Sequence, residues 1–263
     1  MKKSVLFLVV LAVLGMASCE SDSPGDIDGM GDNTEALKVK EPFEMPEGIY
    51  ILGDITGREN GGLKSTQLKS TYSTTATYPC YGSGEWVRLQ LTLLNTRSYR
   101  RTVYFQKGLV WRCQSGGSQH GLQCQTTWIC LEPNSRRTVN IDLYCANLGI
   151  PSPDELSKYE ILGVTSSPTL WKLLNLIGWR KINYEMFYSN LGLKAGEAGP
   201  TYEEIIERVQ TVVHNLTDRG IDITEDDIAF FQSIPELSPE DIPPVDENSQ
   251  YPEYFAEFMT IGK

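Results

Sequence analysis

The chain has 263 residues and a formal net charge of −11 at pH 7, with 34 Asp and Glu residues against 23 Lys and Arg residues. A protein this acidic repels phosphate backbones and anionic head groups, and the sequence has no cluster of basic residues. The composition therefore argues against nucleic acid as a partner. The length is sufficient for one large domain or two small ones with a real hydrophobic core.

The amino-terminal residues have the charge order of an export signal. Lys2 and Lys3 precede an apolar run over residues 5–14, which is too short to span a bilayer. We expect residues 1–18 to be a signal peptide that is removed. Because the net charge of −11 includes the two lysines, the mature chain would carry −11 − 2 = −13.

The run closes with Gly15-Met16-Ala17-Ser18-Cys19, which resembles the lipobox of bacterial lipoproteins. In that family the cysteine becomes the lipidated amino terminus. The resemblance implies that acyl chains on Cys19 hold the protein on the outer membrane of the cell envelope without a spanning helix.

Residues 19–45 are rich in acid and glycine, and such a stretch buries too little apolar surface to offset its ordering entropy. We expect a flexible acidic tether there. The acidic residues directly after Cys19 are similar to the surface-export signals of Bacteroidetes lipoproteins. A solvated linker is the alternative interpretation.

Residues 46–150 read as a series of strands. The clearest strand covers residues 85–93, where Val87, Leu89, Leu91 and Leu93 alternate with polar positions, and residues 137–145 repeat the pattern. Shorter strands are expected at residues 47–53, 101–106, 109–113 and 122–131, and a long loop or weak hairpin over residues 58–77. Short strands separated by turns predict an antiparallel β-sandwich of immunoglobulin-like architecture, whose strand order the sequence does not give.

After Pro151 the spacing of apolar residues changes from the alternation of strands to the period of helices. Helices are expected to open at residues 153–159 and to cover residues 168–177, 184–188, 201–216 and 224–235. The predicted fold class is α+β, with an N-terminal sandwich domain over 46–150 followed by a C-terminal helical half over 151–235. Residues 236–263 form an acidic, proline-rich tail.

Motifs of conventional catalysis are absent from the sequence. His120 and His214 are the two histidines, and neither stands at ligand spacing with cysteines, so no metal site and no cofactor are expected. There is no G-x-S-x-G elbow, no P-loop and no G-x-G-x-x-G after a strand. The spatial pairing of carboxylates is invisible in a sequence, which leaves a glycosidase site open.

The cysteine count is odd once Cys19 is assigned to lipid. Five cysteines remain in a compartment where disulfides form, so at least one thiol is left over or used otherwise. They are Cys80, Cys113, Cys124, Cys130 and Cys145.

Two short motifs resemble those of bacterial thioester-domain adhesins. The first is Tyr144-Cys145-Ala146-Asn147-Leu148 at the end of a predicted strand, and the second is Val209-Gln210-Thr211-Val212-Val213 on a predicted helix. In this chain His214 stands where related helices often carry an aromatic residue, and Asn147 is more polar than that family's motif.

The resemblance implies single-turnover chemistry. The Cys145 thiol would attack the Gln210 carboxamide, release ammonia and leave a thioester, which an amine or hydroxyl of a partner would then open. His214, one helical turn beyond Gln210, would carry the proton. The protein would be a covalent adhesin for a host or cell-surface protein and not a turning-over enzyme.

Each of these residues also has an ordinary structural interpretation. Cys145 lies on the apolar parity of its strand, which favours a core or disulfide role, while glutamines beside an apolar stripe commonly meet water. A second function, non-covalent binding of a glycan or protein, rests on Trp86 at an outward strand position, with Tyr72, Tyr78 and Tyr81 nearby. A structural role in the envelope is the third.

Overall fold

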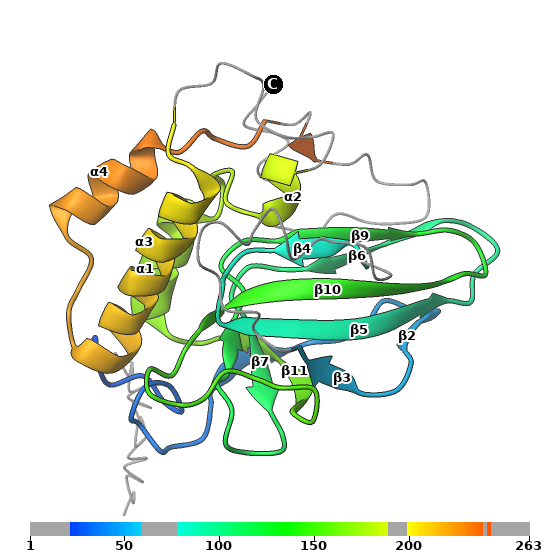
Figure 1. The fold of residues 1–263 in the computed structure, drawn as a ribbon, viewed down its shortest axis with the longest axis horizontal. Helices are drawn as coiled ribbons and strands as arrows, with labels where there is room; N and C mark the ends of the chain where they lie inside the picture. Colours follow the sequence, from blue (N-terminus) through cyan, green and yellow to red (C-terminus); the bar gives the residue numbers. More distant parts are fainter. Residues whose placement is uncertain (1–21, 59–77, 189–198, 239–240, 243–263) are drawn as a thin grey trace, which may run out of the picture.

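The computed structural model describes residues 22–58, 78–188, 199–238 and 241–242 (Figure 1). The predicted signal peptide, the predicted lipidation site Cys19, Tyr72 and most of the predicted tail lie outside these residues.

Six antiparallel strands form a closed barrel. The ring runs β5, β3, β11, β7, β8, β10 and returns to β5, because β10 pairs with β5 over most of its length. The strands are β3 (Ile55–Gly57), β5 (Val87–Asn95), β7 (Leu109–Cys113), β8 (Gly121–Leu122), β10 (Arg136–Cys145) and β11 (Lys158–Thr165).

Further strands extend this barrel. Strand β1 (Val39–Pro42) pairs with β11, β2 (Ile49–Ile51) pairs with β5, and the short β4 (Cys80–Gly82) runs parallel to β10. A separate two-stranded sheet is made by β6 (Arg101–Phe105) and β9 (Thr127–Leu131).

The predicted alternation fills the barrel interior. The apolar positions of β5 and β10 belong to one buried cluster, and these are Val87, Leu89, Leu91, Leu93, Val139, Ile141, Leu143 and Cys145. Each of these side chains is at most 1% exposed. A period of two places every second residue on the same face, so these two strands supply one continuous wall of the core.

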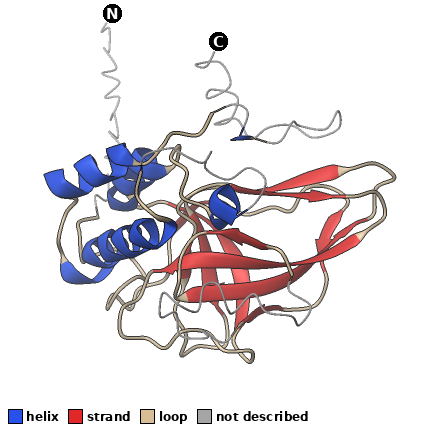
Figure 2. Cartoon of the chain, turned by 45° about the horizontal axis from the view of Figure 1, so that its top comes forward, coloured by secondary structure: helices blue, strands red, loops and turns tan. Residues whose placement is uncertain are grey.

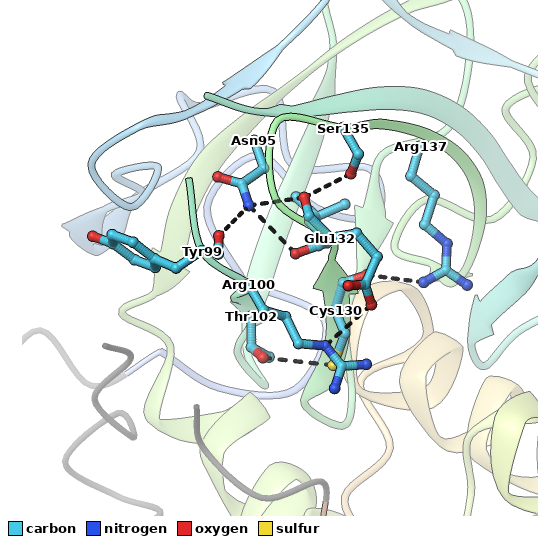
Figure 3. Close-up of polar contacts among 9 residues, drawn as sticks. Asn95, Tyr99, Arg100, Thr102, Cys130, Glu132, Ser135 and Arg137 are labelled. Atoms are coloured by element: carbon cyan, nitrogen blue, oxygen red, sulfur yellow. Dashed lines mark hydrogen bonds and ion pairs between the residues drawn. The ribbon is translucent and has the colours of Figure 1, made fainter. Parts of the chain in front are cut away.

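Asn95, the last residue of β5, fastens the two-stranded sheet to the barrel (Figure 3). Its Nδ2 donates to the carbonyl oxygens of Tyr99, Leu131 and Glu132 at 2.9, 3.3 and 3.0 Å. One buried amide thus shares its two N–H groups among three backbone acceptors at the corner where β9 turns into β10.

The helices gather at one end of the barrel (Figures 1 and 2). They are α1 (Pro168–Ile177), α2 (Tyr184–Tyr188), α3 (Tyr202–His214), the π-helical turn η1 (Asn215–Arg219) and α4 (Glu225–Ser233). Their apolar faces share a second buried cluster that also includes Tyr144 of β10. The predicted helices at 168–177, 184–188, 201–216 and 224–235 are thus present, with boundaries shifted by a few residues.

The predicted immunoglobulin-like sandwich is wrong, and so is the purely helical second half. Strand β11 lies in the region expected to be helical and pairs with both β3 and β7, which closes the sheet into a barrel. The expected helix start at Asp154 is a turn, because the Asp154 carboxylate accepts from the backbone N–H groups of Leu156 and Ser157. A register shift between Ile161 and Gly163 breaks the alternation of β11 and hides it in the sequence.

The amino-terminal segment also differs from the expected tether. Ile27 and Met30 are 3% and 1% exposed and belong to the buried cluster of the helices. Residues 22–33 therefore pack against the body of the protein through two buried apolar side chains, and the N–H groups of Gly25 and Gly31 add backbone hydrogen bonds.

Candidate functional site

Cys145 ends strand β10 at the point where the barrel meets the helices. Strand β5 begins at Val87, opposite Leu143, so β10 extends beyond it. Consecutive strand residues direct their backbone groups to opposite sides, and the N–H of Ala146 donates to the carbonyl of His120 on the β8 side. The N–H and C=O of Cys145 therefore point to the β5 side of β10, at a position where β5 has no residue to pair with them.

Helix α3 supplies the second half of the site. It starts with a reciprocal capping box between Thr201 and Glu204, and its apolar face packs against the other helices and β10. Gln210 and His214 lie one turn apart and are 6% and 8% exposed. Gln210 is thus buried against the barrel and does not face water.

The Gln210 carboxamide makes the two hydrogen bonds that a continuation of β5 would make with Cys145. The N–H of Cys145 donates to Gln210 Oε1 at 2.9 Å, and Gln210 Nε2 donates to the carbonyl oxygen of Cys145 at 2.9 Å. The same Nε2 lies 3.0 Å from Nε2 of His214. Cys145, Gln210 and His214, which the resemblance to thioester domains assigned to one mechanism, form one connected group in the structure.

His214 is placed as a proton acceptor. With Gln210 Nε2 donating, His214 accepts at Nε2 and carries its proton on Nδ1. Burial lowers the pKa of His214, which the carboxylate of Asp218 opposes and Arg219 reinforces. A neutral imidazole at pH 7 is the consequence.

The Cys145 sulfur is held by its own loop. It donates to the carbonyl oxygen of Asn147 at 3.2 Å and accepts from the Asn147 N–H at 3.3 Å. Burial raises the pKa of Cys145 to about 12, partly offset by the Asn147 N–H. The thiol is therefore protonated at neutral pH, and its nucleophilic form requires removal of that proton.

All five cysteines that the structure describes are free. The disulfide interpretation of Cys145 does not hold here, and the core interpretation accounts for its side chain but not for the carboxamide on its backbone. Cys130, which contacts the Thr102 hydroxyl at 3.5 Å, lies in the two-stranded sheet (Figure 3).

An open pocket of about 560 Å³ leads to the buried side chains of Gln210 and His214. Gln210 and His214 form part of its wall, and so does Trp86, which is 44% exposed. The other residues of the wall are Glu85, Gln119, Leu148, Gly149, Glu203, Ile206, Glu207, Thr211 and Arg219. Gln210 and His214 of the thioester hypothesis and Trp86 of the non-covalent binding hypothesis thus line the same pocket.

The charged residues in the wall of this pocket are mostly acidic. Burial raises the pKa of Glu85, Arg88 lowers it and the nearby carboxylate of Glu207 raises it. Three glutamates against one arginine favour a cationic group over an anionic one at the entrance. Of the tyrosines expected beside Trp86, Tyr78 and Tyr81 are not in this wall.

Several residues of the site were not foreseen from the sequence. Glu85 and Glu207 look like ordinary surface carboxylates, and only the approach of α3 to the start of β5 brings them together. For Asn147 the sequence did give an indication of a special role, because a polar residue stands there where the thioester motif has a less polar one. Its side chain lies 3% exposed and is used in two hydrogen bonds.

Among the described residues, no group of three or more His, Cys, Asp or Glu side chains is placed to hold a metal ion. None of the helices described has the length and apolar character needed to cross a bilayer. Comparison with protein-family models, curated proteins and solved structures finds no match for this chain. A function for it must therefore come from the residues of the site.

Proposed function

We propose that the protein is a membrane-anchored envelope lipoprotein that binds a partner covalently through a thioester between Cys145 Sγ and Gln210 Cδ. The observation that carries the proposal is the seating of the Gln210 carboxamide on the backbone of Cys145, with His214 at its nitrogen. An open pocket beside this group gives a partner access to it.

Formation of the thioester would conserve atoms and protons. The Cys145 sulfur attacks Cδ of Gln210, the C–S bond forms, the C–N bond breaks, and the thiol proton ends on the nitrogen that leaves as ammonia. Negative charge develops on Oε1, which the N–H of Cys145 contacts at 2.9 Å. The neutral Nε2 of His214 lies 3.0 Å from the leaving nitrogen, so it can take up the proton given up by the thiol and pass that same proton to the nitrogen.

Opening of the thioester would attach the partner. An amine enters from the pocket and attacks Cδ, a C–N bond forms, the C–S bond breaks, and the proton of the amine is carried to the sulfur. The neutral imidazole of His214 is the base at this position. The acidic wall concentrates cationic amines such as lysine side chains, while Trp86 offers them an aromatic face.

Intact mass spectrometry of the mature protein in amine-free buffer tests the proposal. We expect a deficit of about 17 Da, the mass of one ammonia, and its replacement by a methylamine adduct when that amine is added. Cys145→Ala and Gln210→Ala should each abolish the deficit. Full mass in freshly prepared wild-type protein would end the thioester proposal.

A matched control is available in Cys130→Ala. Cys130 is another free cysteine, located in the two-stranded sheet, and its removal leaves the Cys145–Gln210 contacts in place. This variant should keep both the deficit and the methylamine adduct. Loss of both would show that the chemistry does not depend on Cys145 specifically.

A second candidate is non-covalent binding of a glycan or protein at the same pocket. It is favoured by the half-exposed Trp86 and the exposed Leu148, which give the wall an apolar surface for sugar rings or side chains. Glycan-array binding lost in Trp86→Ala and retained in Cys145→Ala would support it. A partner that remains attached after boiling in denaturant would instead support the thioester.

The membrane anchor is a separate part of the proposal. Metabolic labelling with a fatty acid should mark the wild-type protein and should fail in Cys19→Ser. Unchanged labelling of that variant would remove the lipoprotein assignment without affecting the thioester.

A further inference from the structure

Residues 22–33 form a strap that crosses from the helices to the candidate site. At its start, Asp22 Oδ1 accepts the N–H of Thr169 in the first turn of α1 at 3.1 Å. Farther on, the N–H of Gly25 donates to the carbonyl oxygen of Leu216 in η1 at 2.7 Å. Ile27 and Met30 insert into the helical core between these points and Gly31.

Gly31 contacts both halves of the site. Its N–H donates to the carbonyl oxygen of Ala146 at 2.8 Å, and its own carbonyl oxygen accepts from Asn147 Nδ2 at 3.3 Å. On the opposite side, a Cβ at Gly31 would lie 2.1 Å from the carbonyl oxygen of Thr217. Only glycine fits this close approach, which also requires a φ of +60°.

Asn147 connects the strap to the reactive sulfur. Its side chain accepts from the N–H of His120 at 3.1 Å while it donates to Gly31. Its backbone N–H and C=O both contact the Cys145 sulfur. The position of the Asn147 peptide, and with it that of the sulfur, is thus held by His120, just before β8, and by Gly31 of the strap.

Thr217 belongs to η1, which continues α3 directly, and α3 carries Gln210 and His214. The Thr217 hydroxyl donates to the carbonyl oxygen of Val213 at 2.9 Å, which ties this turn to the helix. The strap therefore touches the loop that holds the sulfur and the turn that extends the helix of the carboxamide.

We propose that Gly31 and Asn147 are positioning residues for thioester formation: through them the amino-terminal strap holds the Cys145 sulfur in register with the Gln210 carboxamide. This inference rests on the proposed thioester. It assigns a role to a segment that follows the predicted anchor Cys19 by three positions in the sequence.

Two substitutions break the strap contact in different ways. Gly31→Ala places a methyl group against the Thr217 carbonyl and forces the strap away. Asn147→Asp keeps an acceptor for the His120 N–H but removes the donor to Gly31. We expect each variant to slow the loss of ammonia after refolding, and the methylamine reaction, by tenfold or more.

Two controls separate positioning from stability. Gly53→Ala has the same backbone strain, with a φ of +73°, but its Cβ would meet nothing within 4 Å. Leu91→Ala opens a cavity in the barrel core, where the side chain is 1% exposed, and does not touch the strap. Both should form the thioester at the wild-type rate at temperatures below their unfolding transitions, which are measured in parallel.

The outcomes distinguish the two proposals. Wild-type protein without the mass deficit overturns the proposed function and this inference together. A wild-type deficit with wild-type rates in both Gly31→Ala and Asn147→Asp overturns the positioning role alone. If Gly31→Ala shows no cooperative unfolding transition, the rate in Asn147→Asp decides. Slowed rates in the strap variants, with normal rates in both controls, support the positioning role.

Discussion

The two ends of β10 differ in what completes them. From Arg136 to Leu143 the strand is paired residue by residue with β5, and its inward side chains fill the barrel. Cys145 lies beyond the start of β5, and the Gln210 side chain of α3 makes the two hydrogen bonds that β5 would otherwise make there. The regular ladder builds only the barrel core, whereas at Cys145 a carboxamide is hydrogen-bonded to the backbone of a residue that carries a thiol.

The largest effect on stability is expected in the paired part. Leu91→Ala should lower the free energy of unfolding by about 2–5 kcal/mol, because it leaves a cavity in a closely packed core. Urea unfolding measures this loss, and intact mass measures the thioester in the same sample at 25 °C. If the variant lost the thioester while still folded, the two ends of β10 would not be independent.

A smaller effect is expected where the side chain replaces the strand. In a Cys145→Ala background, Gln210→Ala leaves the backbone N–H and C=O of residue 145 without partners and should cost about 1–3 kcal/mol. Gln90→Ala, which removes a part-buried side-chain bond to Asn140 in the paired region, should cost about 1 kcal/mol or less. Equal losses by urea unfolding would mean that Gln210 does not complete the ladder.

Glu185 of α2 offers a second case of a side chain that serves a strand. Its Oε2 accepts the N–H of Gly82 in β4 at 2.8 Å, and burial raises its pKa to about 8. Because the folded-state pKa is above the ordinary value of 4.5, this group stabilises the fold most at low pH, and its contribution falls as pH rises toward 8.

The slope from this one group is at most about 1.4 kcal/mol per pH unit between these values. Glu185→Gln should therefore flatten the dependence of unfolding free energy on pH, as measured by urea unfolding at pH 5, 6.5 and 8. Parallel profiles for the variant and the wild type would show that the carboxylate does not titrate in that window.

The smallest effect concerns the wall of the pocket. Trp86→Ala should leave the mass deficit intact but raise the amine concentration for half-maximal labelling by two- to fivefold, which corresponds to about 0.5–1 kcal/mol of contact with a cation. Labelling with a series of alkylamines measures it. A loss of the deficit itself in this variant would assign Trp86 to thioester formation and not to the entrance.

The same contrast explains what the sequence could predict. Alternation along β5 and β10 and the capped helix α3 are local signals, and the structure confirms all three. Strand β11 was missed because the acidic turn at Asp154 resembles a helix start and the register shift before Gly163 interrupts its alternation. Without β11 the barrel cannot close, so the strands that were recognised led to the wrong architecture, an open sandwich.

For the site, the resemblance to thioester domains singled out Cys145 and Gln210, and the structure brings them into contact. The orientation of the carboxamide and the convergence of Trp86 with Glu207 depend on how α3 crosses the end of the barrel. Such long-range placement leaves no periodic trace in the sequence. The strap, likewise, is held by two buried apolar residues and by backbone hydrogen bonds, within a stretch whose composition is typical of a linker.

The most direct test of the covalent account is peptide mapping of the mature protein after pepsin digestion at low pH, without prior reduction or exposure to amines. We predict one cross-linked species that joins the peptide containing Cys145 to the peptide containing Gln210, lighter than their sum by about 17 Da. Two separate linear peptides, with the Cys145 thiol fully available to an alkylating reagent, would contradict it.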